Sequence, residues 1–154
     1  MKTLKLTVNE DKTHLCDLPQ ERFDFLGYTF GRCYRHDSGR AYLGTKPSKK
    51  SIKRMVDSIS SETDRHRTVL DAEKIVGGLN RKLNGWVNYF CLGPVSPAYR
   101  AINTHVTNRL RRWLCKKHKV RGNGWSRYPN QYLHEQLGLV NLPQRTRSFP
   151  WAKV

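Results

Sequence analysis

The stretch Leu79–Phe90, with the sequence LNRKLNGWVNYF, decides the fold of this 154-residue chain. Its apolar residues recur at intervals of four, three and four positions, a spacing that places them on one helical face: Leu79, Leu83, Trp86 and Phe90. The basic and amide residues between them fall largely on other faces. We therefore expect an amphipathic helix that is packed from one side and approached from the other by a negatively charged partner.

The flanking segments extend this pattern into a bundle. Ser48 is a suitable N-cap for a helix with apolar residues at helical spacing from Ile52 to Ile59. The central helix is expected to begin near residue 70 or 71, after a polar loop over residues 60–68. Ser96 and Pro97 open a further helix, whose apolar stripe includes Trp113 and continues to about Lys117.

The ends of the chain follow other patterns. Residues 4–8 alternate apolar and polar, as in a half-buried strand, and a returning strand begins at Lys12. Residues 25–44 are typical of a β-hairpin, in which Gly27 marks a bulge or the close approach of another backbone. Residues 129–137 favour a short helix closed by Gly138. The segment 139–154 is expected to pack in an extended form through Leu142, Phe149 and Trp151.

These elements predict an α+β fold that is mainly α. N-terminal strands and a hairpin precede a three-helix bundle, and an irregular C-terminal segment follows it. We expect three parts, namely residues 1–45, a helical domain over 46–138, and an extension over 139–154 that packs on this domain.

Charge is the dominant feature of the composition. The chain has 29 Lys and Arg against 12 Asp and Glu, a formal net charge of +17. Residues 31–154 carry 25 of these bases and only 7 of the acids. Such an excess repels itself and is typical of proteins that bind a polyanion, most often nucleic acid. The alternative is a basic surface that is merely solvated.

Other chemistry finds little support. Two Cys-x-x-His pairs, Cys33 with His36 and Cys115 with His118, offer zinc-ligand types but lie far apart in the sequence. No spacing of the six histidines favours a nuclease. We expect no metal, no cofactor and no catalytic residue. No apolar run resembles a signal peptide or approaches the roughly 20 residues that span a bilayer, so we expect a cytoplasmic protein with no membrane partner.

Basic residues are instead interleaved with aromatic ones, as in Arg111-Arg112-Trp113 and Trp125-Ser126-Arg127-Tyr128. Cations bind phosphates, and aromatic or guanidinium planes stack on unpaired bases. Periodicity assigns Trp113, like Trp86, to the core. The expected RNA-binding residues are Lys49, Lys50, Lys53, Arg54, Arg81, Lys82, Arg109, Arg111, Arg112, Lys116, Lys117, Lys119, Arg121 and Arg127.

The motifs Phe23–Phe30 (FDFLGYTF), Lys46-Pro47-Ser48 and Leu83–Phe90 (LNGWVNYF), in this order, resemble the C-terminal part of group II intron-encoded reverse transcriptase/maturases. The resemblance covers nearly the whole chain. It implies that Phe25, Leu26 and Gly27 form a primer-grip-like hairpin. It also implies that the helices form the thumb, or maturase-specific domain, with Leu79, Leu83, Trp86, Phe90 and Trp113 in its core.

In that family the domain binds intron RNA, assists splicing and holds the template–primer duplex, within a mobile element. This chain contains no Tyr-x-Asp-Asp polymerase motif and no endonuclease motif, so we expect no enzyme activity from it alone. The first hypothesis is an RNA-binding splicing module. The alternatives are the C-terminal subunit of a split reverse transcriptase, whose N-terminal part is encoded separately, and a generic basic remnant.

Overall fold

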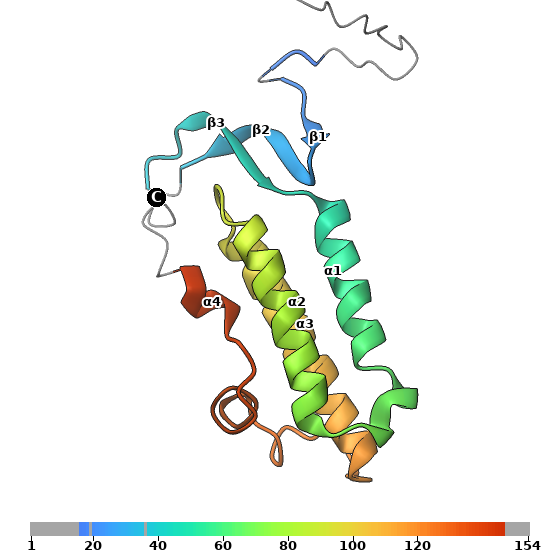
Figure 1. Cartoon of the computed structure of the whole chain (residues 1–154). Coiled ribbons are helices and arrows are strands. Elements are labelled where there is room, and N and C mark those ends of the chain that lie inside the picture. The colour runs from blue at the N-terminus through green and yellow to red at the C-terminus, as the bar shows by residue number, and fades with distance from the viewer. Residues whose placement is uncertain (1–15, 19, 36, 147–154) are drawn as a thin grey trace, which may run out of the picture.

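In the computed structural model, which describes residues 16–18, 20–35 and 37–146, three antiparallel strands lie across one end of a helical bundle (Figure 1). The α+β, mainly α fold class is therefore confirmed. The strands are β1 (Phe23–Phe25), β2 (Tyr28–Tyr34) and β3 (Ala41–Pro47). The helices that follow them are α1 (Lys49–Glu62), η2 (Arg65–Val69), α2 (Ala72–Tyr89), α3 (Ser96–Lys117), η3 (Tyr132–Gln136) and α4 (Leu142–Arg145).

The turn between β1 and β2 fastens the sheet to α1. Phe25 pairs with Tyr28 across the turn. Leu26 and Gly27 both have positive φ, as a two-residue type I′ turn requires, so Gly27 is not a bulge. The Gly27 carbonyl accepts hydrogen bonds from the Ser48 backbone N–H and from Ser51 Oγ, each at 2.8 Å. The close approach was correctly expected, and the neighbour is the first turn of α1.

The strand expected over residues 4–8 lies outside the described residues, as does most of the segment that begins at Lys12. The hairpin over residues 25–44 is confirmed in β2 and β3, which pair from Tyr28 with Pro47 to Tyr34 with Ala41. Its second strand runs three residues further than expected and leads directly into the N-cap of α1 at Ser48.

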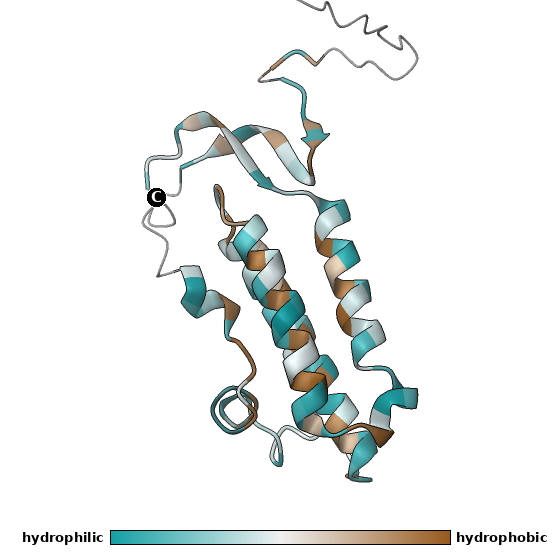
Figure 2. Cartoon of the chain, viewed as in Figure 1, coloured by the Kyte–Doolittle hydropathy of each residue, from teal (hydrophilic) through white to brown (hydrophobic). Residues whose placement is uncertain are grey.

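The core lies among α1, α2 and α3, and residues of the C-terminal segment join it. Apolar residues recur along these helices between polar ones (Figure 2). Leu79, Leu83 and Trp113 are essentially fully buried, and Phe90 is 8 % exposed. Trp86 differs from the expectation because it is only half-buried, although its ring packs 4.7 Å from that of Phe90 and 5.8 Å from that of Tyr99.

The helix boundaries follow the expected caps with two corrections. Ser96 is the first residue of α3 and not its N-cap, which is Val95 and makes no side-chain cap hydrogen bond. The Ser48 side chain accepts a hydrogen bond from the Ser51 N–H at 3.2 Å, which confirms the N-cap. Residues 60–68 are not a loop. Helix α1 continues to Glu62, and the Asp64 side chain accepts from the His66 N–H at 2.9 Å and starts the short 3-10 helix η2. The polar composition of residues 60–68 therefore does not indicate a loop, because most of the segment is helical.

The C-terminal segment packs along α2 and α3. The Asn80 side chain donates to the Gly138 carbonyl at 2.8 Å and accepts from the Val140 N–H at 2.9 Å. Leu142 is fully buried in α4, a helical turn where we expected extended chain. The expected helix over 129–137 is confirmed only as the shorter η3. Phe149 and Trp151 lie outside the described residues.

Two glycine substitutions test the attachment of the hairpin. Gly27 and Gly39 both have positive φ, but a Cβ on Gly27 would lie 2.8 Å from Ser51 Oγ and 3.0 Å from Phe90. A Cβ on Gly39 meets no atom of the described residues within 4 Å. We expect Gly39→Ala to destabilise the protein by about 1 kcal/mol and Gly27→Ala to destabilise it clearly more. Urea unfolding measures both, and equal losses would contradict the close approach.

Candidate nucleic-acid interface

The first two turns of α1 carry a group of exposed cations. Ser51, Met55 and Ile59 are buried on the inner face of this helix. The same helical period turns the basic residues outward, and all of them are exposed: Lys49, Lys50, Lys53 and Arg54. The first turn contains no acidic residue. Because the N-terminus of a helix is electrically positive, this placement of four cations is unfavourable for the helix itself.

A second group of cations lies at the C-terminal end of α3. Arg112 and Lys116 are one turn apart and exposed. They line two shallow hollows, one of about 190 Å³ that also contains Arg65 and one of about 420 Å³ that also contains Lys119. Among the described residues, Arg112 and Lys116 make no ion pair with an acid. We call Arg65, Arg112, Lys116 and Lys119 the α3 basic cluster.

Arg111 is the clearest correction to the expected RNA-binding set. It is 1 % exposed, and its guanidinium donates to the Tyr128 carbonyl at 2.8 Å, to Asn108 Oδ1 at 3.0 Å and to Asn130 Oδ1 at 2.5 Å. Burial lowers the pKa of Arg111 below its ordinary value. With its donors used inside the protein, this side chain has no access to a phosphate.

Trp125 completes the surroundings of Arg111. The guanidinium carbon lies 3.7 Å from the centre of the Trp125 ring, a close cation–π contact. Trp125 itself remains half exposed. The alternation of basic and aromatic residues around positions 111–128 therefore reflects, in part, an internal contact between α3 and the segment that follows it.

Arg109 and Lys117 also serve the fold. Arg109 donates to the Ser60 carbonyl at 2.9 Å and to Thr63 Oγ1 at 3.1 Å, at the C-terminal end of α1. The Lys117 ammonium donates to the carbonyls of Thr68 and Leu70 at 3.0 and 2.8 Å. Both cations satisfy carbonyl oxygens that lack helical partners, and they hold α3 against α1 and η2.

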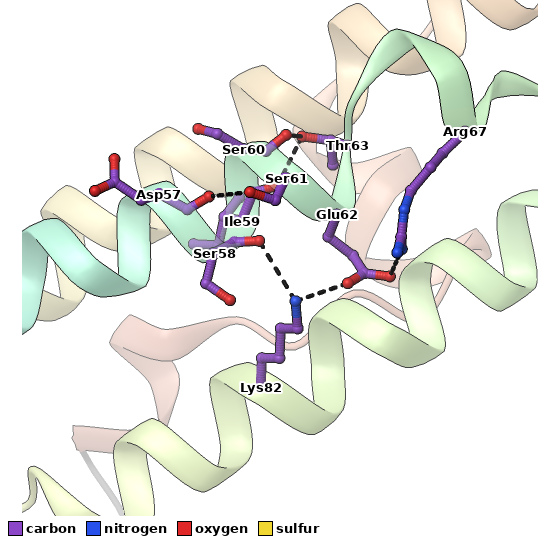
Figure 3. Close-up of polar contacts among 9 residues, drawn as sticks. All are labelled: Asp57, Ser58, Ile59, Ser60, Ser61, Glu62, Thr63, Arg67 and Lys82. Carbon is purple, nitrogen blue, oxygen red and sulfur yellow. Dashed lines mark hydrogen bonds and ion pairs between the residues drawn. The ribbon is translucent and has the colours of Figure 1, made fainter.

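Lys82 is held between α1 and α2 (Figure 3). Its ammonium lies 2.7 Å from Glu62 Oε2 and 3.5 Å from the Ser58 carbonyl, and Glu62 also pairs with Arg67. Burial opposes the charge of Glu62, but the hydrogen bonds and charges of Lys82 and Arg67 outweigh it and lower the pKa of Glu62 below its ordinary value. A Cβ on Gly78 would lie 2.9 Å from Glu62, so this glycine makes room for the carboxylate.

The other expected cations are exposed but dispersed: Arg81 on α2, Arg121 after α3, and Arg127 beyond the glycine-rich loop. Sequence reasoning missed Arg65, which lies beside Arg112 and Lys116 only because η2 folds back on α3. The alternation of basic residues at positions 65–67 was the available signal. Phe25, Leu26 and Gly27 form the β1–β2 turn, away from the α3 basic cluster (Figure 1).

Metal-ligand types do not gather in the part of the chain that the structure describes, where no group of three or more His, Cys, Asp or Glu residues lies close enough to hold an ion. Cys115 is buried, and a Cβ on Gly124 would lie 2.2 Å from its sulfur, so the thiol is closely packed. Among the described helices, none is long and apolar enough to cross a membrane.

The helical core and its outward cations correspond to a known family. Residues 52–132, more than half of the chain, match the model of the group II intron, maturase-specific domain. The chain belongs to this family. A search of curated proteins found no match. The matched segment of the maturase-specific domain runs from α1 to η3 and contains the whole α3 basic cluster. The family describes a maturase-specific domain and not a polymerase catalytic domain.

Arg111 and Arg112 are neighbours, one buried and one exposed, and allow a matched test of a structural role against a surface role. Lys cannot reproduce the forked hydrogen bonds of Arg111, so Arg111→Lys should lower the free energy of unfolding by about 2 kcal/mol. Arg112→Lys, one position further on an exposed face, should change it by less than about 0.5 kcal/mol. Urea unfolding of both variants measures this, and equal values would contradict the buried role of Arg111.

The Glu62 carboxylate makes a pH-dependent contribution to stability. Because its pKa is lowered in the folded state, the contribution is present above the ordinary value of 4.5 and is lost as the pH falls through the folded pKa. We expect Glu62→Gln to be less stable than the parent by about 0.5–1 kcal/mol at pH 7, since its partners are partly exposed. The difference should shrink towards zero in strong acid. Thermal unfolding across pH 2–7 measures it, and a constant difference would contradict this account.

Proposed function

We propose that this maturase-specific domain binds structured group II intron RNA through its exposed cations and thereby assists splicing. The observation that carries the proposal is the concentration of exposed basic residues at the start of α1, where they destabilise the helix electrostatically and make no ion pair with a described acidic residue. A bound polyanion turns this unfavourable arrangement into a favourable one.

The arrangement of the cations favours an extended partner. The α1 group lies at the sheet end of the bundle and the α3 basic cluster at the opposite end (Figure 1). The 14 residues of α1 alone correspond to about 21 Å of helix. A small anion cannot contact both groups, whereas a folded RNA or a template–primer duplex can. Intron RNA is favoured because the chain belongs to the maturase-specific family.

Binding should depend steeply on salt, because each phosphate contact releases counterions. Arg112→Ala combined with Lys116→Ala should weaken binding to intron RNA and reduce the slope of log affinity against log salt by about 2. The matched control is Arg35→Ala combined with Arg40→Ala, which removes two exposed cations from the turn between β2 and β3. Filter binding from 50 to 400 mM salt measures both pairs.

Equal effects of the two pairs would show that only net charge matters, and an affinity indifferent to salt would contradict phosphate binding. Competition between a folded intron and an unrelated RNA of equal length separates an intron-specific module from a generic basic protein. A splicing assay of the intron at low magnesium, with and without the protein, tests the assisting role directly.

A second candidate function is that of a C-terminal subunit that completes a separately encoded reverse transcriptase. It is favoured by the exposed apolar residues of the sheet, among them Tyr34 (61 % exposed) and Leu43 (58 % exposed), which offer a contact surface to another protein. Reverse transcriptase activity that appears only when the two chains are mixed would support this function.

A further inference from the structure

A hollow of about 540 Å³ lies between α1 and α2 beneath the β1–β2 turn. Met55, Trp86 and Phe90 give it apolar walls, and Ser51 and Ser58 lie along α1. The carbonyl of Ser58 accepts a hydrogen bond from the Lys82 ammonium (Figure 3). Of the residues that line the hollow, Arg54 is one of the cations expected to contact phosphates. Phosphate binding does not account for the apolar walls.

Exposed apolar side chains gather at the edge of the hollow. Leu26 is 68 % exposed and lines it together with Tyr89, which is 51 % exposed, and Phe25 adjoins them at 58 %. Leu26 also has a φ of 49°, a left-handed conformation that is unfavourable for residues other than glycine. Strained residues of this kind persist where the surroundings impose them, often at ligand sites.

The surroundings that impose this conformation can be named. The Tyr89 hydroxyl donates to the Leu26 carbonyl at 2.9 Å, and the Gly27 carbonyl receives the two hydrogen bonds from the start of α1 described above. The turn is thus fixed from both helices, and it presents Leu26 at the hollow. A purely structural turn at this place would be served equally well by glycine.

Aromatic rings and cations together specify the occupant. The Phe90 ring centre lies 4.7 Å from that of Trp86 and 4.8 Å from that of Tyr89. The Trp86 indole nitrogen is buried and has no hydrogen-bond partner among the described residues. Arg54 stands at the hollow, and Lys50 lies one turn before it on the same edge of α1. An apolar recess with cations at its edge is complementary to a flat base that is flanked by phosphates.

We propose that this hollow receives a single unpaired base of the bound RNA, displaced from a bulge or loop, while Arg54 and Lys50 contact the adjacent phosphates. The inference rests on the proposed RNA binding and deepens it, because it assigns a recognition element that distinguishes interrupted helices from continuous ones. Phosphate contacts alone do not make that distinction.

The test uses the full chain and two RNA hairpins that differ by one unpaired nucleotide, a 2-aminopurine bulge in a 20-base-pair stem. We expect the bulged RNA to bind about tenfold more tightly than the paired one, as one stacked base allows. The 2-aminopurine fluorescence should change on binding. Leu26→Gly suits the positive φ of this position, and Ser58→Phe fills the hollow. Both should bring the ratio of the two affinities close to one.

Val69→Ala is the matched control, because Val69 is an aliphatic residue that is 87 % exposed and lies in η2, away from the hollow. It should leave the ratio unchanged. Circular dichroism and urea unfolding check that each variant is folded. Since Leu26→Gly removes backbone strain, it keeps the test valid even where Ser58→Phe disturbs the packing of α1.

Several results would overturn the inference. Equal affinities of the parent protein for the two hairpins would refute it and leave the proposed function intact, provided that binding remained salt-dependent. An absence of binding to either RNA would refute both. A bulge preference that survives in both hollow variants would place the recognition elsewhere. Self-association that Leu26→Gly abolishes, without a bulge preference in the parent, would show that the patch binds protein instead.

Discussion

The scarcity of acidic residues constrains how this chain can hold its helices together. With 12 carboxylates for 29 basic side chains, the cations at helix junctions cannot all find a carboxylate. The structure uses backbone carbonyls in their place. Arg109 reaches the end of α1, Lys117 reaches η2, and Arg111 reaches the segment that crosses α3. Each contact satisfies carbonyl oxygens that a helix end or a loop leaves without partners.

This use of internal cations divides the basic residues into two populations. One is committed to the fold, and its donors point at carbonyls, amide oxygens or Glu62. The other population is exposed, mostly at the two ends of the bundle, and the α1 group and the α3 basic cluster within it make no ion pair with a described acidic residue. Membership of the maturase-specific family and the position of the second population both favour RNA as the partner. The net charge of the chain therefore overstates the number of side chains that a phosphate can contact.

Much of the helical architecture could be predicted from the sequence. Periodicity identified the three long helices, and the N-cap at Ser48 placed the start of α1 correctly. The Ser96-Pro97 pair placed the start of α3, although its N-cap is Val95 and not Ser96. These signals are local, since a cap or an apolar face depends on residues within a few turns. The N-cap at Asp64 was missed because a polar run hid it among other polar residues.

The roles of the individual cations could not be predicted in the same way. Arg111 and Arg112 are identical neighbours in the sequence, and only the return of residues 125–130 across α3 buries the first of them. Which segment approaches Gly27 likewise could not be predicted, because that depends on where the first turn of α1 lies in space. Trp86 packs against Phe90 and Tyr99, as a core residue would. It is only half-buried because it also lines the hollow, which is formed by the hairpin and two helices together.

The two hydrogen bonds on the Gly27 carbonyl also have a mechanical consequence. Since the Ser48 N–H and Ser51 Oγ share one acceptor, the tip of the hairpin is anchored at two points of a single helical turn. The Tyr89 hydroxyl adds a third point from α2. These three hydrogen bonds therefore restrain the tip of the hairpin relative to both α1 and α2. A displacement of the strands at this turn has to break them or carry the two helices with it.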